Sequence, residues 1–199
     1  MKLEIKYNKT VLREFQTKLK MRQKALPTLK NKEAALRAMV FDTRKRMDEA
    51  AGILRKQLEG MDRWKALWNE FDFSLLQVKR VNVSRTKIAG ILIPQFDGLE
   101  AELKEFSLML YPDWFSEGLP ELKRLLEYTA MHEVLEERLH LLEQARKKAT
   151  QKVNLYEKVQ IPALESAIRQ IKRYLEDEDN LSKASQKLLK TKMQKISEL

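Results

Sequence analysis

The stretch LREFQTKLKMRQKALPTLKNKEAALRAMV, residues 12–40, decides the fold, because its apolar side chains recur in alternating steps of three and four. The same spacing continues to Leu75, and fifteen of its nineteen positions are apolar. A repeat held over this many turns favours a coiled-coil helix over an ordinary surface helix. We therefore predict one long N-terminal helix over residues 10–78. The repeat positions are Leu12, Phe15, Leu19, Arg22, Leu26, Leu29, Glu33, Leu36, Val40, Thr43, Met47, Ala50, Leu54, Gln57, Met61, Trp64, Trp68, Phe71 and Leu75.

A second repeat predicts a C-terminal helix over residues 121–195, with a change of phase close to Pro162. Such a change alters the supercoil locally. Two long helices with one apolar face each bury those faces most simply by packing on one another as an antiparallel hairpin. The first phase holds Leu135, Leu139, Leu142, Ala149, Val153 and Tyr156, and the second holds Ile161, Leu164, Ile168, Ile171 and Leu175.

The middle of the chain, residues 79–120, has a different pattern. Alternation begins near Val81, and the run IAGILIP at residues 88–94 is rich in β-branched side chains. This predicts a short β-hairpin with its turn at residues 84–87, followed by a short helix over residues 98–111. The predicted fold is all-α: one elongated domain over residues 1–199, built as a long antiparallel two-helix coiled-coil hairpin with a small knob of β-hairpin and short helix.

Charge and composition limit the class of protein. The chain has 39 Lys and Arg against 29 Asp and Glu, a net charge of +10, and no cysteine, which excludes disulfides and Cys-ligated zinc. Mean hydropathy is −0.53, and we expect neither a membrane-spanning segment nor a secretion signal, hence a cytoplasmic protein. Residues 1–80 carry a charge of +10, residues 81–140 carry −5 and residues 141–199 carry +5.

Motifs for chemistry are missing from the sequence. It contains no GxxxxGK[ST] or GxGxxG phosphate loop and no GxSxG elbow. Glu137 and His140 match the Glu-x-x-His pattern of di-iron helix bundles, but His132, the only other histidine, has Thr129 where the glutamate should be. We therefore predict no catalytic residues, no cofactor and no metal site, and interpret this segment as a solvated acidic helix face.

Two groups of side chains are candidates for binding a partner. Basic residues near the two ends of the chain, namely the basic group given below together with Lys24, Lys183 and Lys195, could bind nucleic acid, but the aromatic side chains that would stack on bases lie elsewhere. The aromatic group suits either core packing or a partner interface, and the sequence leaves both open. The basic group is Lys18, Lys20, Arg22, Lys187, Lys190 and Lys192. The second group is Trp64, Trp68, Trp114 and Phe115, with Ile91 and Ile93 of the hairpin.

Two stretches resemble a known family. VNLYE at residues 153–157 and IPALE at residues 161–165, followed by Ile168 and Ile171, are similar to the VNxLE and IPxLExxIxxI motifs of the D subunit of V-type (A/V-type) ATPases. TLKNKEAAL, residues 28–36, resembles the family's LLKxKRxxL stretch, with Glu in place of Arg and Thr in place of Leu. The resemblance covers nearly the whole chain in order. Its structural motif residues are Val153, Asn154, Glu157, Ile161, Pro162, Leu164, Glu165, Ile168 and Ile171.

The resemblance implies a non-catalytic rotor axle in the central stalk of a rotary ATPase, peripheral to the membrane and without nucleic acid. Its partners would be the A and B subunits of the catalytic ring, the F subunit of the stalk, and the ring-connecting subunit of the d/C type. The basic group would face the catalytic ring, and the aromatic and hairpin group the other two partners. The alternatives are a coiled-coil adaptor or export-stalk protein and, in another class, a basic coiled-coil nucleic-acid binder.

Overall fold

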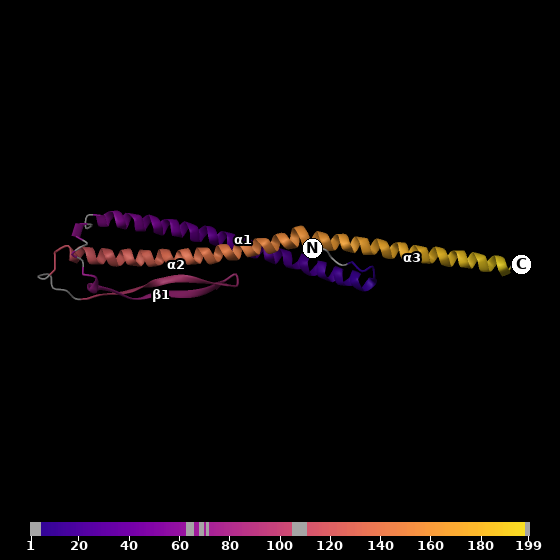
Figure 1. The fold of residues 1–199 in the computed structure, drawn as a ribbon, viewed down its shortest axis with the longest axis horizontal. Coiled ribbons are helices and arrows are strands. Elements are labelled where there is room, and N and C mark those ends of the chain that lie inside the picture. Colours follow the sequence, from indigo (N-terminus) through magenta and orange to yellow (C-terminus); the bar gives the residue numbers. More distant parts are fainter. Residues whose placement is uncertain (1–4, 63–65, 68–69, 71, 105–110, 198–199) are drawn as a thin grey trace. The chain divides into compact units, whose positions relative to one another are not determined.

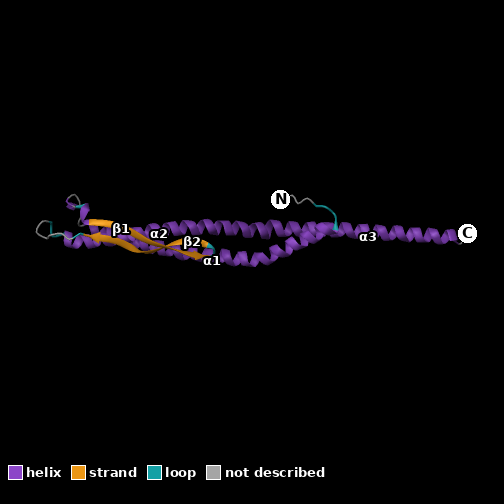
Figure 2. Cartoon of the chain, turned by 90° about the horizontal axis from the view of Figure 1, so that it is seen from below, coloured by secondary structure: helices purple, strands orange, loops and turns teal. Residues whose placement is uncertain are grey.

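The computed structural model describes residues 5–62, 66–67, 70, 72–104 and 111–197. Contacts group the chain into two compact units, the first made of Met1–Asn31 with Ala149–Leu199 and the second of Lys32–Lys148. The described part is mainly helical with a two-stranded sheet in mid-chain, which confirms the predicted fold class (Figures 1 and 2). The single elongated domain stays a prediction. The elements are α1 (Lys9–Met61), η2 (Phe73–Leu75), β1 (Leu76–Ile88), β2 (Ile91–Leu103), α2 (Phe115–Asn154), η3 (Leu155–Gln160) and α3 (Ile161–Ser197).

Helix α1 follows the predicted repeat. All fifteen repeat positions from Leu12 to Met61 are buried or half-buried, and all but three of the positions between them are exposed. Even the polar Thr43 is only 1% exposed. The helix is capped by Asn8, whose side-chain oxygen accepts a hydrogen bond of 2.7 Å from the backbone N–H of Val11. Burial of the repeat, rather than intrinsic helix propensity, therefore orders this helix.

In the first unit, the N-terminal part of α1 packs antiparallel to α3. The rings of Tyr7 and Tyr174 lie 4.8 Å apart, and the Lys30 ammonium lies 2.6 Å from the carboxylate of Glu157. The residue number therefore rises on α1 as it falls on the partner helix, which confirms the antiparallel pairing within this unit. The core between the helices is formed by Phe15, Leu164, Ala167, Ile168 and Ile171.

The predicted change of phase coincides with a π-helical turn, η3. The apolar repeat passes from Tyr156 to Ile161, both half-buried, in a step of five residues, and the backbone N–H of Ile161 donates to the carbonyl of Tyr156. A bond between residues five apart defines the π-helix. Pro162 follows directly, and a proline cannot donate to the preceding turn and crowds the carbonyl four residues earlier. The wider turn accommodates both the proline and the shifted repeat.

The hairpin of the second unit differs from its prediction. Strands β1 and β2 each have thirteen residues, and the turn lies at Ala89–Gly90 rather than at residues 84–87. Both turn residues have positive φ, 52° at Ala89 and 81° at Gly90, as a two-residue turn of type I′ requires. The β-branched run at residues 88–94 therefore spans the end of one strand and the start of the next.

The short helix predicted over residues 98–111 is wrong for residues 98–103, which belong to β2, and residues 105–110 lie outside the described part. The apolar spacing of Leu99 and Leu103 fits a helix, but it fits period-two alternation equally well once Ala101 is counted. Pairing decides the outcome, since Leu99 lies opposite Val81 and Leu103 opposite Leu76.

The limits of both predicted helices also change. Helix α1 ends at Met61 rather than at residue 78, and α2 begins at Phe115 rather than at residue 121. Leu75 fits the spacing of the apolar repeat but does not belong to α1. It is apolar because it is buried in a separate cluster with Trp114, Phe115 and Leu119. Gly118 lies within α2 next to the Trp114 ring, where a Cβ atom would be only 2.8 Å from that ring.

Candidate partner-binding surfaces

The C-terminal part of α3 is the longest exposed stretch of the described chain. Every residue from 176 to 194 is exposed, including Lys187, Lys190 and Lys192. Large apolar side chains are exposed among these lysines, with Leu181 at 70%, Leu188 at 66%, Leu189 at 62% and Met193 at 72%. A helix that exposes apolar and basic groups together has the composition of a protein-binding surface.

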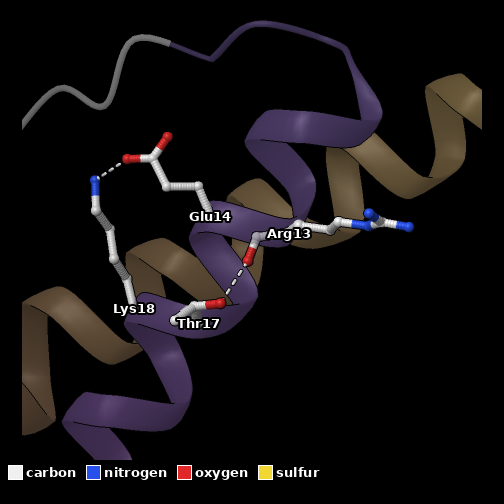
Figure 3. A network of polar contacts seen from close by, with 4 residues as sticks. All are labelled: Arg13, Glu14, Thr17 and Lys18. Atoms are coloured by element: carbon white, nitrogen blue, oxygen red, sulfur yellow. Dashed lines mark hydrogen bonds and ion pairs between the residues drawn. The ribbon is translucent and has the colours of Figure 1, made fainter.

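The N-terminal lysines of the basic group lie on α1 of the first unit. Lys18 forms an ion pair with Glu14 one turn earlier, while the hydroxyl of Thr17 donates to the carbonyl of Arg13 at 2.9 Å (Figure 3). Lys18 is also 5.9 Å from the centre of the Phe15 ring. Lys20 is exposed. Exposed pairs of this kind contribute about 0–1 kcal/mol, so Lys18 remains available to a partner.

Arg22 differs from the other members of the basic group. It is half-buried at a repeat position, where its Nε donates to the side-chain oxygen of Gln160 at 2.5 Å. Its guanidinium also lies 5.6 Å from the centre of the Tyr156 ring. Arg22 therefore contacts both ends of the π-helical turn within its own chain, which explains why a basic residue occupies the apolar repeat.

Two members of the aromatic group, Trp114 and Phe115, are buried in the structure, and two others lie outside the described residues. Trp114 is 8% exposed and Phe115 is fully buried, with ring centres 4.5 Å apart, so core packing accounts for both. In the hairpin, Ile93 is fully buried and Ile91 is half-buried. Trp64 and Trp68 lie outside the described residues.

The family-motif residues line the helix pair of the first unit. Leu164, Ile168 and Ile171 form its core, and Val153 and Ile161 are half-buried. The polar members act at the rim, where Glu157 pairs with Lys30 and Glu165 accepts a hydrogen bond of 3.5 Å from Gln23. Asn154 and Pro162 are exposed.

Sequence reasoning missed the outward face of the hairpin. Strand β1 exposes Val78, Val81 and Val83, whereas Phe96 of β2 lies against the helices of the second unit. The alternating valines are evident in the sequence. The sequence does not show which of the two strands packs on the helices and which is exposed to solvent. Phe96 helps to line a shallow groove of about 300 Å³ formed with Arg46, Glu49, Ala50, Ile53, Met131 and Leu135.

Local electrostatics in the second unit stabilise the base of the hairpin. The Asp72 carboxylate accepts a hydrogen bond of 2.9 Å from the backbone N–H of Ser74 and one of 3.1 Å from the Tyr111 hydroxyl. The backbone bond from Ser74 is the largest cause that lowers the pKa of Asp72, and the same carboxylate raises the pKa of Tyr111. On the strands, the hydrogen bond from Lys79 lowers the pKa of Glu102.

A metal centre finds no support in the described residues, which contain no group of three or more His, Asp or Glu side chains placed to hold an ion. His140 instead has its Nε2 2.7 Å from the Gln144 amide nitrogen on the next turn. None of the described helices is both long and apolar enough to cross a bilayer.

Comparison with known proteins gives matches along nearly the whole chain. A family model described as the D subunit of ATP synthase matches residues 11–191. A protein of Borreliella burgdorferi, named as the D subunit of a V-type ATP synthase, is 31% identical over 192 residues, which is 96% of this chain and 95% of that protein. Proteins of the same name from Chlamydia muridarum and Chlamydia pneumoniae are 29% and 28% identical, covering 100% and 98% of this chain and 100% and 95% of theirs.

Proposed function

The chain belongs to the family of V-type ATP synthase D subunits, and from this premise we propose that it is the rotor axle of the central stalk. In this role it transmits torque between ATP hydrolysis or synthesis in the catalytic ring and ion translocation in the membrane ring. The observation that carries the proposal is the uninterrupted burial of the helical repeat from Leu12 to Met61. Continuous packing of this kind resists twisting, as an axle must.

A non-catalytic role accompanies the proposal. The sequence has no phosphate-binding loop, so nucleotide chemistry would occur on the A and B subunits of the ring. The axle contributes by presenting a different side to each catalytic site as it turns. Such a role needs stiffness and an exposed surface rather than an active site.

The exposed part of α3, residues 176–194, is the segment we assign to the catalytic ring. Its lysines Lys187, Lys190 and Lys192 attract an acidic or carbonyl-lined bearing without fixing one orientation, because exposed ion pairs are weak and screened by salt. Lys18 and Lys20 would add to this basic surface. Arg22 is left out, because its guanidinium is occupied within its own chain.

The remaining partners, the F subunit and the ring-connecting subunit of the d/C type, are assigned to the second unit. Residues 81–140 carry a net charge of −5, opposite in sign to the rest of the chain. Ile91 remains a candidate contact, whereas Ile93, Trp114 and Phe115 are occupied in the chain's own core. In the assembled complex the chain would be cytoplasmic and peripheral to the membrane.

Cross-linking in the assembled complex tests the assignment of α3. Because the chain has no native cysteine, a Lys187→Cys variant carries one reactive thiol, and a Glu137→Cys variant is a matched control in the second unit. We expect a bifunctional reagent to join Lys187→Cys, but not Glu137→Cys, to the catalytic ring and to stop ATP hydrolysis. Active complexes from which this chain is absent would instead favour the adaptor alternative.

A further inference from the structure

The two strands of the hairpin face different surroundings. On β2, Ile93 and Pro94 are buried and Phe96 lies in the groove against α1 and α2. On β1, ten of thirteen residues are exposed, including Val81 and Val83 at 38% and 42%. The inner strand therefore holds the hairpin on the helices of the second unit, and the outer strand is presented to solvent.

Strand β1 also has a free backbone edge in the described part of the chain. It pairs with β2 alone, in a two-stranded antiparallel sheet. An antiparallel strand directs only about half of its N–H and C=O groups to one neighbour, so the other half point away from β2. A thirteen-residue edge offers enough of these groups to pair with a further extended segment.

The charges of the two strands are opposite. Strand β1 carries Lys79, Arg80, Arg85 and Lys87 and no acidic residue, whereas β2 carries three acidic residues and no basic one. Lys79 is paired with Glu102 of β2 at 2.6 Å. Within the described residues, no ion pair joins the other three cations to another side chain. Strand β1 therefore has a surplus of one positive charge over the acidic residues of β2, and three of its four cations are not paired within the described hairpin.

This excess selects among possible occupants of the edge. A second copy of the chain would bring four cations opposite four cations, which is unfavourable for directly facing strand pairs. An acidic extended segment would match the cations and cover Val81 and Val83 with its own apolar side chains. The positive edge thus disfavours self-association and favours one kind of partner.

We propose that β1 docks an acidic, extended segment of a partner protein, which adds a third strand to the hairpin. The inference rests on the proposed function, because it takes the partner to be another protein of the same complex. A three-stranded sheet packed on helices is more stable than a two-stranded ribbon, so docking also stiffens the hairpin.

Residue-resolved amide exchange in the isolated chain and in the assembled complex tests this docking. Strand addition places new hydrogen bonds on every second residue, so alternate β1 amides should exchange about tenfold more slowly in the complex. Amides already bonded to β2 should change less. Unchanged exchange along β1 in an active complex that contains the chain would overturn the docking proposal alone, and failure of the chain to enter the complex would overturn both proposals.

Charge reversal provides the matched control. The triple variant Arg80→Glu, Arg85→Glu, Lys87→Glu should abolish the alternate protection. The triple variant Lys147→Glu, Lys148→Glu, Lys152→Glu makes the same change in net charge at exposed positions of α2 and should keep it. Equal loss in both variants would contradict a local acidic partner. Slower exchange of the β1 amides in the isolated chain at higher protein concentration would also contradict it, because the occupant would then be a second copy. Slower exchange on adding DNA or anionic vesicles would contradict it as well, because the occupant would then be a nucleic acid or a membrane.

Discussion

In the first unit, α1 as far as Asn31 and α3 bury a repeat that can be followed along the sequence. The second unit continues the α1 repeat to Met61 but adds a cluster drawn from segments with no common period. Phe15 and Ile171 belong to repeats of three and four. Leu75, Trp114 and Phe115 meet only because a short 3₁₀ turn and the start of α2 converge. Periodic burial spreads stability over many similar positions, and the convergent cluster concentrates it in a few rings.

The largest expected effect is therefore at the convergent cluster. Phe115→Ala should lower the free energy of unfolding by about 3–5 kcal/mol, because the ring is fully buried and its removal leaves a cavity. Phe41→Ala removes the same ring from a position that is 75% exposed and should change stability by about 0.5 kcal/mol or less. Denaturant unfolding of the isolated chain measures both, and equal losses would erase the contrast.

A glycine pair sharpens the comparison. Gly118→Ala should destabilise the chain by about 1–3 kcal/mol, since the new methyl group would press on the buried Trp114 ring at 2.8 Å. Gly52→Ala, in the interior of α1 with nothing within 4 Å of its Cβ position, should stabilise by about 0.5–1 kcal/mol. Thermal unfolding gives both signs. A stabilising effect of Gly118→Ala would contradict this prediction, because it would show that the Trp114 indole can move away from the new methyl group at little cost.

The π-helical turn of the first unit offers a smaller effect. Arg22→Ala removes the hydrogen bond to Gln160 and the contact with the Tyr156 ring, and should cost about 1 kcal/mol. Arg37→Ala removes a pair with Glu33 one turn away, in which the Arg37 side chain is 67% exposed, and should cost about 0.3–0.5 kcal/mol. Amide exchange of Ile161 should also accelerate in the Arg22 variant alone. Identical behaviour of the two variants would mean that Arg22 does not hold the turn.

The smallest effect concerns pH. The pKa of Asp72 is lowered in the folded chain, chiefly by the backbone N–H of Ser74, so its carboxylate stabilises the fold above the ordinary pKa of 3.8. That contribution is lost as the pH falls through the lowered folded value. The stability difference between the wild type and Asp72→Asn should therefore shrink below pH 3.8. A difference that grows on acidification has the wrong sign for this account.

These contrasts also explain which parts of the structure the sequence could predict. The long helix α1 could be predicted because its apolar residues recur with the helical period at every turn. The change of phase near Pro162 could be predicted from the five-residue step from Tyr156 to Ile161. The strand from Ile91 to Leu103 could not be predicted, because Leu99 and Leu103 satisfy a helical and a strand period at once. Only the pairing with β1, a contact between distant residues, distinguishes the two.

Some residues of the candidate surfaces could likewise be placed from the sequence, and others could not. Composition alone showed that Lys187, Lys190 and Lys192 would be exposed, since no apolar seam could bury so many charges. The burial of Trp114 and Phe115 could not be predicted, because an aromatic pair suits a core and an interface equally. Arg22 is a basic residue at an apolar repeat position, and the sequence alone does not explain it. The structure does, because its guanidinium contacts Gln160 and the ring of Tyr156.

Rotation of this chain inside the complex is the most direct test of the central claim. Because the sequence has no cysteine, Glu133→Cys and Glu137→Cys place two thiols at exposed positions of α2 for attaching a bead. With the catalytic ring fixed to a surface, the account predicts that the bead turns in one direction when ATP is added and stops when ATP is exhausted. A bead that stays still while the same complexes hydrolyse ATP would contradict the claim that this chain is the axle.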